Sequence, residues 1–288
     1  MKAIYKRELR SYFTGIIGYL FIFFVLLFAG IYVTALSFSN SFLSDIVYTL
    51  SNVLFVVIFI MPVLTMRMFA EEKQNKTDQL LYSLPVSVTE TVLAKFFAAA
   101  TVYGMTVAFI CIYPIVFSAF GNVNLLFAYG SIFAFFLAGL TLISVGMFIS
   151  SLVSKQIVAI VITLASMLLI LLMSSLATLI PTTPIASFIA FTVVIVLFGG
   201  LVYLLVKNYL VSLASAAILE AILAVVFLLK KDSFGGLFAK VLGWFTIFEK
   251  FDSFSLGMFD LSSVIYYLSF TALFVFFTVQ SVEKRRWS

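Results

Sequence analysis

The feature that most limits how this chain can fold is a series of apolar stretches, each about as long as a membrane-crossing helix. A helix needs roughly 20 apolar residues to span the hydrocarbon core of a bilayer. The mean hydropathy of +1.24 and the 64% share of hydrophobic residues exclude an ordinary soluble domain. We therefore predict an all-α polytopic membrane protein, with a single transmembrane domain over residues 1–288. Its eight spans are residues 16–36, 47–66, 96–120, 125–150, 157–180, 185–206, 209–229 and 261–282.

The number of spans has an alternative, because only Lys207 and Asn208 separate the sixth stretch from the seventh. If this hairpin enters the membrane without crossing it, the chain has six spans. Both interpretations give an even number of spans. In both, the C-terminus therefore returns to the side of the N-terminus.

The distribution of basic residues predicts the orientation. Lys and Arg accumulate on the cytoplasmic side of membrane proteins. With both termini inside, thirteen of the seventeen Lys and Arg residues are internal, and only Lys230, Lys231, Lys240 and Lys250 are external. We expect a multi-pass protein of a bacterial cytoplasmic membrane with both termini in the cytoplasm. Because the positive charge reports orientation, it does not indicate a nucleic-acid partner.

Residues 1–15 form a predicted interfacial helix at the cytoplasmic surface. Lys2, Lys6 and Arg10 lie largely on one side of this helix. A signal peptide is the alternative, but residues 16–36 exceed the length of a signal core and no convincing cleavage site follows. The residues on the other side are apolar or aromatic: Tyr5, Leu9, Tyr12 and Phe13.

Residues 67–95 are the one long polar interruption expected on the cytoplasmic side, with four basic and four acidic residues. A soluble partner would have to bind there. Thr77 can cap a short helix, and Pro85 ends it because proline disfavours helical geometry in the preceding residue. The leucines of this helix are Leu80, Leu81 and Leu84.

A second helix is predicted to begin directly after this break. Ser87 and Glu90 fit a capping box, in which each side chain bonds a backbone N–H group of the other residue. The interruption is thus expected to be a helix, a break and a helix exposed beyond the membrane. The alternative is an ordinary solvated loop whose leucines rest on the bilayer.

Residues 230–260 form the longest predicted external loop. Lys240, Glu249 and Lys250 are polar, whereas seven residues form an apolar helical stripe. We expect an amphipathic helix that lies in, or re-enters, the outer leaflet. It either gates an exit or has only a structural, lipid-facing role. The stripe consists of Phe234, Leu237, Phe238, Val241, Leu242, Phe245 and Phe248.

Glu220 lies near the middle of a predicted span, where a bare carboxylate would cost a few kcal/mol. Ser212, Ala216 and Ala224 flank it at intervals of four, which gives a face that a second helix can approach closely. Three interpretations follow: a substrate or proton contact, a packed and hydrogen-bonded carboxyl, or a span that is wrongly placed.

The composition predicts no catalytic, cofactor-binding or metal-binding site. The chain has no His and a single Cys, Cys111, so the usual bases, ligands and disulfides are absent. No G-x-x-x-x-G-K-[ST] phosphate loop occurs in the sequence. If ATP drives this protein, the ATPase must therefore be on another chain.

Two separated blocks of the sequence stand out. The first runs from Phe69 to Ser87, with Lys95 opening the next span. The second is at the C-terminal end and comprises Phe251, Asp252, Ser253, Phe254, Gly257, Asp260, Lys284, Arg285, Arg286 and Trp287. Together the two blocks resemble ABC-2 type transporter permeases, particularly the branch that includes gliding-motility permeases. The Asp78-Gln79 pair of the first block departs from the Glu-bearing form typical of this family.

The resemblance implies a permease subunit, expected to be an exporter, that pairs with a second permease, identical or related. Two ABC ATPase subunits, which carry ATP and Mg, would drive it. The alternatives are an ATP-independent secondary transporter or channel, and a membrane scaffold that anchors an ATPase. The ATPase-coupling residues that the resemblance implies are Glu71, Glu72, Thr77, Leu80, Leu81, Leu84 and Pro85, with Lys155 in a second, smaller contact.

Overall fold

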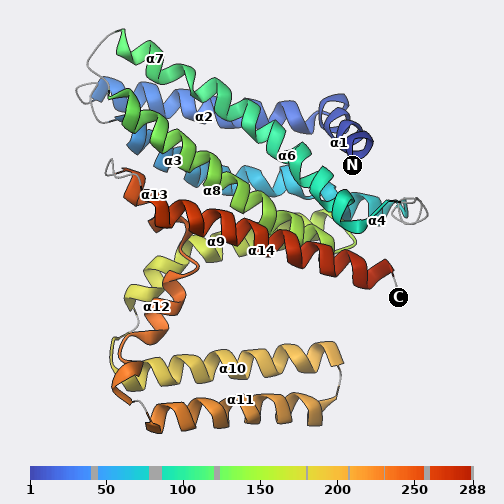
Figure 1. The fold of residues 1–288 in the computed structure, drawn as a ribbon, viewed down its shortest axis with the longest axis vertical. Helices are drawn as coiled ribbons and strands as arrows, with labels where there is room; N and C mark the ends of the chain where they lie inside the picture. Colours follow the sequence, from blue (N-terminus) through green and yellow to red (C-terminus); the bar gives the residue numbers. More distant parts are fainter. Residues whose placement is uncertain are drawn as a thin grey trace. The chain divides into compact units, whose positions relative to one another are not determined.

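The computed structural model describes residues 1–39, 45–77, 86–119, 124–179, 181–206, 208–229, 231–255 and 260–286 (Figure 1). Every element within these residues is helical, and they contain no strand. This confirms the prediction of an all-α polytopic fold. The contacts divide the chain into two compact units, one of Met1–Leu168 with Ile247–Ser288 and one of Leu169–Thr246.

The first unit is a bundle of long helices with short elements at its ends. Both described chain ends, the start of α1 and the end of α14, lie at the same end of this bundle, beside α4 (Figure 1). The elements are α1 (Lys2–Thr14), α2 (Ile17–Ser39), α3 (Asp45–Thr65), η1 (Arg67–Glu71), α4 (Glu72–Gln74), α6 (Val88–Ile110), α7 (Ile112–Ser118), α8 (Leu125–Leu152), the first part of α9 (Gln156–Leu179), α13 (Ile247–Ser255) and α14 (Leu261–Arg286).

Helix α8 is the central element of this unit. In its most apolar 18-residue window, 78% of the residues are buried, against 22% in α14. Gly139 admits a neighbouring helix closely, because a Cβ atom there would lie 2.2 Å from ring carbons of Tyr103. The Tyr103 hydroxyl donates a hydrogen bond to the carbonyl of Phe135 at 2.7 Å. Small residues on α8 thus allow large buried side chains of α6 to fill the core.

Seven helices in the described part of the chain are long and apolar enough to cross a membrane. They coincide with seven of the eight predicted spans. The remaining predicted span, 185–206, coincides with α10 (Pro184–Val206), whose described apolar stretch, Pro184–Gly200, is shorter. The expected multi-pass membrane protein is confirmed at this level, and the choice between six and eight spans stays a prediction.

The second unit is built on a hairpin of α10 and α11 (Tyr209–Leu229), which lie side by side (Figure 1). The end of α9, η2 (Lys231–Phe234) and α12 (Leu237–Gly243) complete it. Phenylalanine rings fill one end of the hairpin, with centroids 4.7 to 6.4 Å apart. These rings belong to Phe188, Phe191, Phe227, Phe234 and Phe238.

The segment 231–255, expected to be external, differs from the single amphipathic helix predicted over its apolar stripe. It contains η2, α12 and α13, with a break at 244–246. Phe234 and Phe238 are buried, whereas Phe245 is 43% exposed. The stripe therefore belongs to more than one element, because the aromatic residues before the break pack on α10 and α11 rather than continuing one helical face.

Candidate coupling site

The polar interruption begins as a continuation of α3 in which the helix widens. Residues Arg67–Glu71 form a π-helical turn, η1, and α4 follows directly. A π turn adds one residue per turn and disturbs the regular backbone hydrogen bonds of the helix. Such a turn needs other partners for the backbone groups that it releases.

Ser150 of α8 supplies these partners. Its hydroxyl accepts hydrogen bonds from the N–H groups of Phe69 at 3.2 Å and Ala70 at 3.1 Å. The same hydroxyl donates to the carbonyl of Met66 at 3.1 Å. All three bonds converge on one buried side chain. The π turn is therefore fixed to the end of α8 through Ser150.

Helix α4 is fixed to the end of α8 and to the start of α9. The Lys73 ammonium donates a hydrogen bond to the carbonyl of Ser151. The Gln156 N–H donates to Oε1 of Gln74 at 3.1 Å. Lys155, the predicted smaller contact, lies next to Gln156, and its side chain is exposed. The structure thus brings together the two regions that were expected to contact one partner.

Four charged residues join α1, α4 and α6; we call Arg7, Glu8, Glu72 and Lys95 the charge quartet. The Lys95 ammonium lies 2.9 Å from Glu72 and 3.2 Å from Glu8, as ion pairs rather than well-directed hydrogen bonds. The Arg7 guanidinium lies 2.6 Å from Glu8 and 3.0 Å from Glu72. Two positive and two negative groups leave the quartet electrically neutral.

Lys95 is the most buried member of the quartet. Its side chain is 1% exposed, and its ammonium lies 5.2 Å from the centre of the Phe69 ring. A buried charge requires partners, because removing it from water costs several kcal/mol. The two carboxylates and the aromatic ring face supply those partners.

The quartet changes the acidity of Glu8. Burial alone would raise the pKa of this carboxyl, but the charges of Lys95 and Arg7 outweigh burial and hold the pKa below its usual value. Glu8 is therefore ionised in the folded protein at neutral pH. In a separate pair, the hydrogen bond with Glu71 raises the pKa of the Arg67 guanidinium.

The predicted coupling residues fall into two groups. Glu71 pairs with Arg67 within η1, and Glu72 belongs to the charge quartet. Thr77 is exposed, and both its N–H group and its hydroxyl donate to the carbonyl of Glu72, so that it closes the end of α4. Four predicted positions lie outside the described residues: Leu80, Leu81, Leu84 and Pro85.

The predicted capping box at the start of α6 is half formed. The Ser87 hydroxyl accepts the N–H group of Glu90 at 3.2 Å, which confirms Ser87 as the N-cap. The prediction that the Ser87 N–H group donates back to the Glu90 carboxylate is wrong. This carboxylate instead lies 3.2 Å from the amino group of Met1. The amino group competes for this carboxylate because it carries a full positive charge, whereas a backbone N–H group does not.

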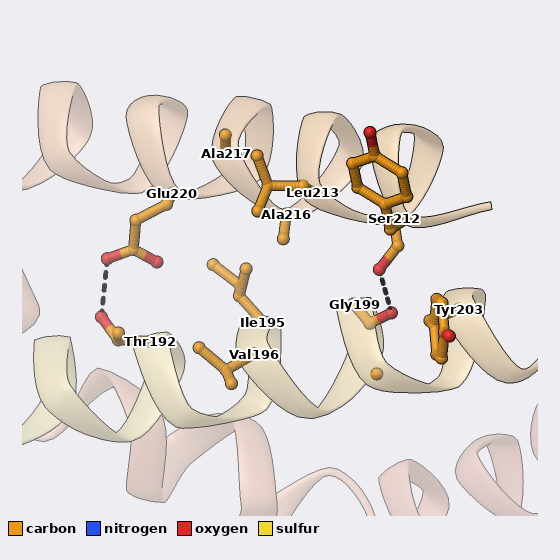
Figure 2. A pocket seen from close by; sticks show the side chains of 12 residues that line it. Thr192, Ile195, Val196, Gly199, Tyr203, Ser212, Leu213, Ala216, Ala217 and Glu220 are labelled. Carbon is orange, nitrogen blue, oxygen red and sulfur yellow. Dashed lines mark hydrogen bonds between the residues drawn. The ribbon is translucent and has the colours of Figure 1, made fainter.

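Glu220 lies in the hairpin of the second unit (Figure 2). Its Oε1 atom accepts a hydrogen bond from the Thr192 hydroxyl at 2.8 Å, and the Ser212 hydroxyl donates to the Gly199 carbonyl at 2.6 Å. The small-residue face of α11 thus packs on α10. Of the three interpretations of Glu220, this geometry corresponds to a packed, hydrogen-bonded carboxyl.

The hairpin also carries a cavity of about 500 Å³, lined mainly by apolar side chains. The second carboxyl oxygen of Glu220, Oε2, is buried and has no hydrogen-bond partner among the described residues. A role of Glu220 in transport stays a prediction.

Comparison with known families identifies the group to which this chain belongs. The model of the family described as ABC-2 family transporter protein matches residues 33–229, which is more than half of the chain. The chain belongs to the ABC-2 transporter family. No curated protein and no solved structure matches it. The protein is thus a non-catalytic, multi-pass permease subunit of an ABC transporter, and such permeases generally work with ABC ATPase partners.

The sequence did not predict several residues that build the coupling site of this permease. The contacts of Ser150 and Lys73 and the Glu8–Lys95 pair were not predicted, although the resemblance placed the smaller contact in the loop of residues 150–156. One signal was present for the pair, since Glu8 is the only acidic residue before Asp45 and Lys95 lies inside an apolar run. Ser150 had no comparable signal, because serine is common in the apolar helices of this permease.

The structure also corrects the predicted faces of α1. Its buried residues are Ile4 and Tyr12, and Glu8 lies between them at the same spacing of four. Leu9 and Phe13 are instead half-buried and share the opposite side of the permease helix with the exposed Lys6 and Arg10. The prediction was wrong because it grouped residues by polarity rather than by their position on the helix.

Proposed function

We propose that this chain is the membrane subunit of an ATP-driven exporter and that its coupling segment, residues 71–85, receives force from a separate ABC ATPase. The observation that carries the proposal is the contact of Glu72 and Lys95, which stand on either side of residues 78–85. An ATPase that moved this segment would move both of its ends together.

The contacts of the two ends give the path for that force. The end at α4 is bonded to α8 through Ser150 and to the Ser151 carbonyl through Lys73. The end at α6 is tied to α1 through the charge quartet. Because α8 is the buried centre of its unit, a displacement of α4 acts on the core of the bundle.

We further propose the assembly that the resemblance implies. Two ATPase subunits, which bind ATP and Mg, act on two permeases, identical or related. The permease has eight spans and lies in a bacterial cytoplasmic membrane with both termini in the cytoplasm. We also propose that the chain belongs to the gliding-motility branch of the family, which its two blocks of sequence resemble. Lys155 contributes the smaller contact with the ATPase.

The test uses the full permease in nanodiscs with its ABC ATPase. Leu81→Ala is expected to weaken ATPase binding about tenfold or more, since a buried anchor contributes a large share of binding energy. Leu126→Ala is the matched control, because Leu126 is 79% exposed at the start of α8. The permease alone is expected to bind no ATP.

Two results would overturn the proposal. One is unchanged ATPase binding and ATP-driven turnover in the Leu81→Ala complex. The other is full transport by the purified permease without any ATPase, which would favour the ATP-independent alternative.

A further inference from the structure

The exposed side of α1 carries positive charge that no acidic group of this helix balances. Glu8 is the only acidic residue of α1, and its carboxylate is turned toward Lys95. Lys2, Lys6 and Arg10 are exposed, and within the described residues none of them forms an ion pair. Because Glu8 is paired within the quartet, the charged groups that α1 presents on its outer side are all positive.

This cationic side carries a groove of about 800 Å³. Leu9 and Phe13 line it with apolar groups, and the polar groups come from Lys6, Arg7, Arg10, Ser11 and Thr14, of which Arg7 is already paired within the quartet. Residues three and four apart lie next to each other on a helix, so the cations and the apolar side chains alternate along one surface. The groove is amphipathic over about two helical turns.

The position of the groove along the chain sets its depth in the membrane. Only Gly15 and Ile16 separate α1 from α2, which is long and apolar enough to cross the bilayer. The rings of Phe13 in α1 and Tyr19 in α2 are in edge contact, with centroids 5.4 Å apart. The groove therefore lies at the boundary between hydrocarbon and headgroups, where aromatic rings concentrate.

We propose that this groove binds an anionic phospholipid. The ammonium of Lys6 and the guanidinium of Arg10 contact the negative headgroup. Leu9 and Phe13 contact the first methylene groups of an acyl chain. The depth and the alternation of charge with apolar surface fit a lipid better than a soluble phosphate or an acidic protein, neither of which would need the apolar wall.

The test measures binding of dansyl-labelled phosphatidylglycerol to the purified full chain in a neutral detergent. Phosphatidylcholine, which is zwitterionic and has no net charge, is the comparison lipid. The double variant K6Q/R10Q is expected to lose about thirtyfold in affinity for phosphatidylglycerol, since each basic residue near an anionic surface contributes about fivefold. Affinity for phosphatidylcholine is expected to stay unchanged. K6R/R10K, which keeps both charges, is expected to retain binding.

The matched control is K231Q/K240Q, which removes two exposed cations elsewhere in the chain. It is expected to bind phosphatidylglycerol like the unmodified protein. Equal binding of the two lipids by the unmodified chain would overturn the proposal. An equal loss of phosphatidylglycerol affinity in K6Q/R10Q and K231Q/K240Q would overturn it as well. Full displacement of the lipid by millimolar inorganic phosphate would also overturn it, in favour of a soluble anion. Loss of ATPase binding in K6Q/R10Q with lipid binding intact would assign the groove to a protein partner instead.

Discussion

The ammonium of Lys95 in α6 and the carboxylate of Glu72 in α4 lie 2.9 Å apart, on either side of residues 78–85 of the coupling segment. The Lys95 side chain is 1% exposed and the Glu72 side chain 18% exposed. Water therefore screens this pair weakly, and the two ends of the segment are held together by a contact that is costly to break.

Replacing Lys95 should destabilise the permease strongly. Lys95→Ala leaves the carboxylates of Glu8 and Glu72 with Arg7 alone, and breaking a buried pair in this way costs about 3 kcal/mol. For a chain of this size we expect the melting temperature in detergent to fall by roughly 6 to 12 °C. Lys155→Ala, which removes an exposed cation from the neighbouring loop, should change it little. Equal melting temperatures for the two variants would contradict a stabilising role for the quartet.

The quartet should also make stability depend on pH in a defined direction. The pKa of Glu8 is lowered in the folded protein, because the charges of Lys95 and Arg7 outweigh its burial. The stabilisation is thus fully present above the usual carboxyl pKa, about 4.3, and is lost as the pH falls through the lowered value. The melting temperature of Glu8→Gln should lie below that of the unmodified protein at pH 6, and the gap should close in acid.

Glu283→Gln is the control for this pH dependence, since Glu283 is exposed. Its melting temperature should follow that of the unmodified protein at every pH. A gap for Glu8→Gln that widened in acid would reverse the predicted sign and exclude an ionised Glu8 in the folded state.

Removing the Ser150 hydroxyl should loosen the π turn. In Ser150→Ala, the N–H groups of Phe69 and Ala70 lose the hydroxyl that accepts their hydrogen bonds in a buried site, and an unsatisfied buried group costs about 1–3 kcal/mol. Hydrogen exchange of residues 66–74 should accelerate accordingly. Ser166→Ala removes a half-buried hydroxyl that donates to the Ile162 carbonyl of its own helix, and it should leave that exchange unchanged.

The sequence predicted the parts of the fold that depend on local composition. Each predicted span coincides with a helix, because the length and polarity of an apolar run decide whether it can cross a membrane. Ser87 was recognised as an N-cap because capping involves residues only three positions apart.

The candidate site could be predicted only in part, because its contacts join distant residues. Arg7 and Glu72 are 65 positions apart, and Phe69 and Ser150 are 81 positions apart. No local periodicity reports such pairs. The π turn likewise depends on Ser150 of another helix. The faces of α1 were assigned wrongly for a different reason, because residues were grouped by polarity rather than by position on the helix. At 3.6 residues per turn, Leu9 and Phe13 lie beside Lys6 and Arg10, and Glu8 shares the buried side with its neighbours four positions away.

Two glycines of α8 give a matched test of its packing. Gly139→Ala would place a methyl group 2.2 Å from the Tyr103 ring, which is fully buried. Overpacking of this kind costs about 1–3 kcal/mol. Gly130→Ala meets nothing within 4 Å and should be neutral or slightly stabilising, since alanine favours helix over glycine. The melting temperature should therefore fall in Gly139→Ala and should stay unchanged or rise slightly in Gly130→Ala.

The hydrogen bond between Thr192 and Glu220 predicts how the α10–α11 hairpin tolerates substitution. Glu220→Gln keeps an oxygen that can accept from the Thr192 hydroxyl, so the melting temperature should stay unchanged. Thr192→Val removes the donor with little change of shape and should cost about 0.6 kcal/mol, a typical value inside a membrane. The double variant should be destabilised no more than Thr192→Val, because both substitutions act on the same hydrogen bond. A Glu220→Gln variant that keeps its melting temperature but loses ATP-driven transport would show that the carboxyl acts in transport as well as in packing.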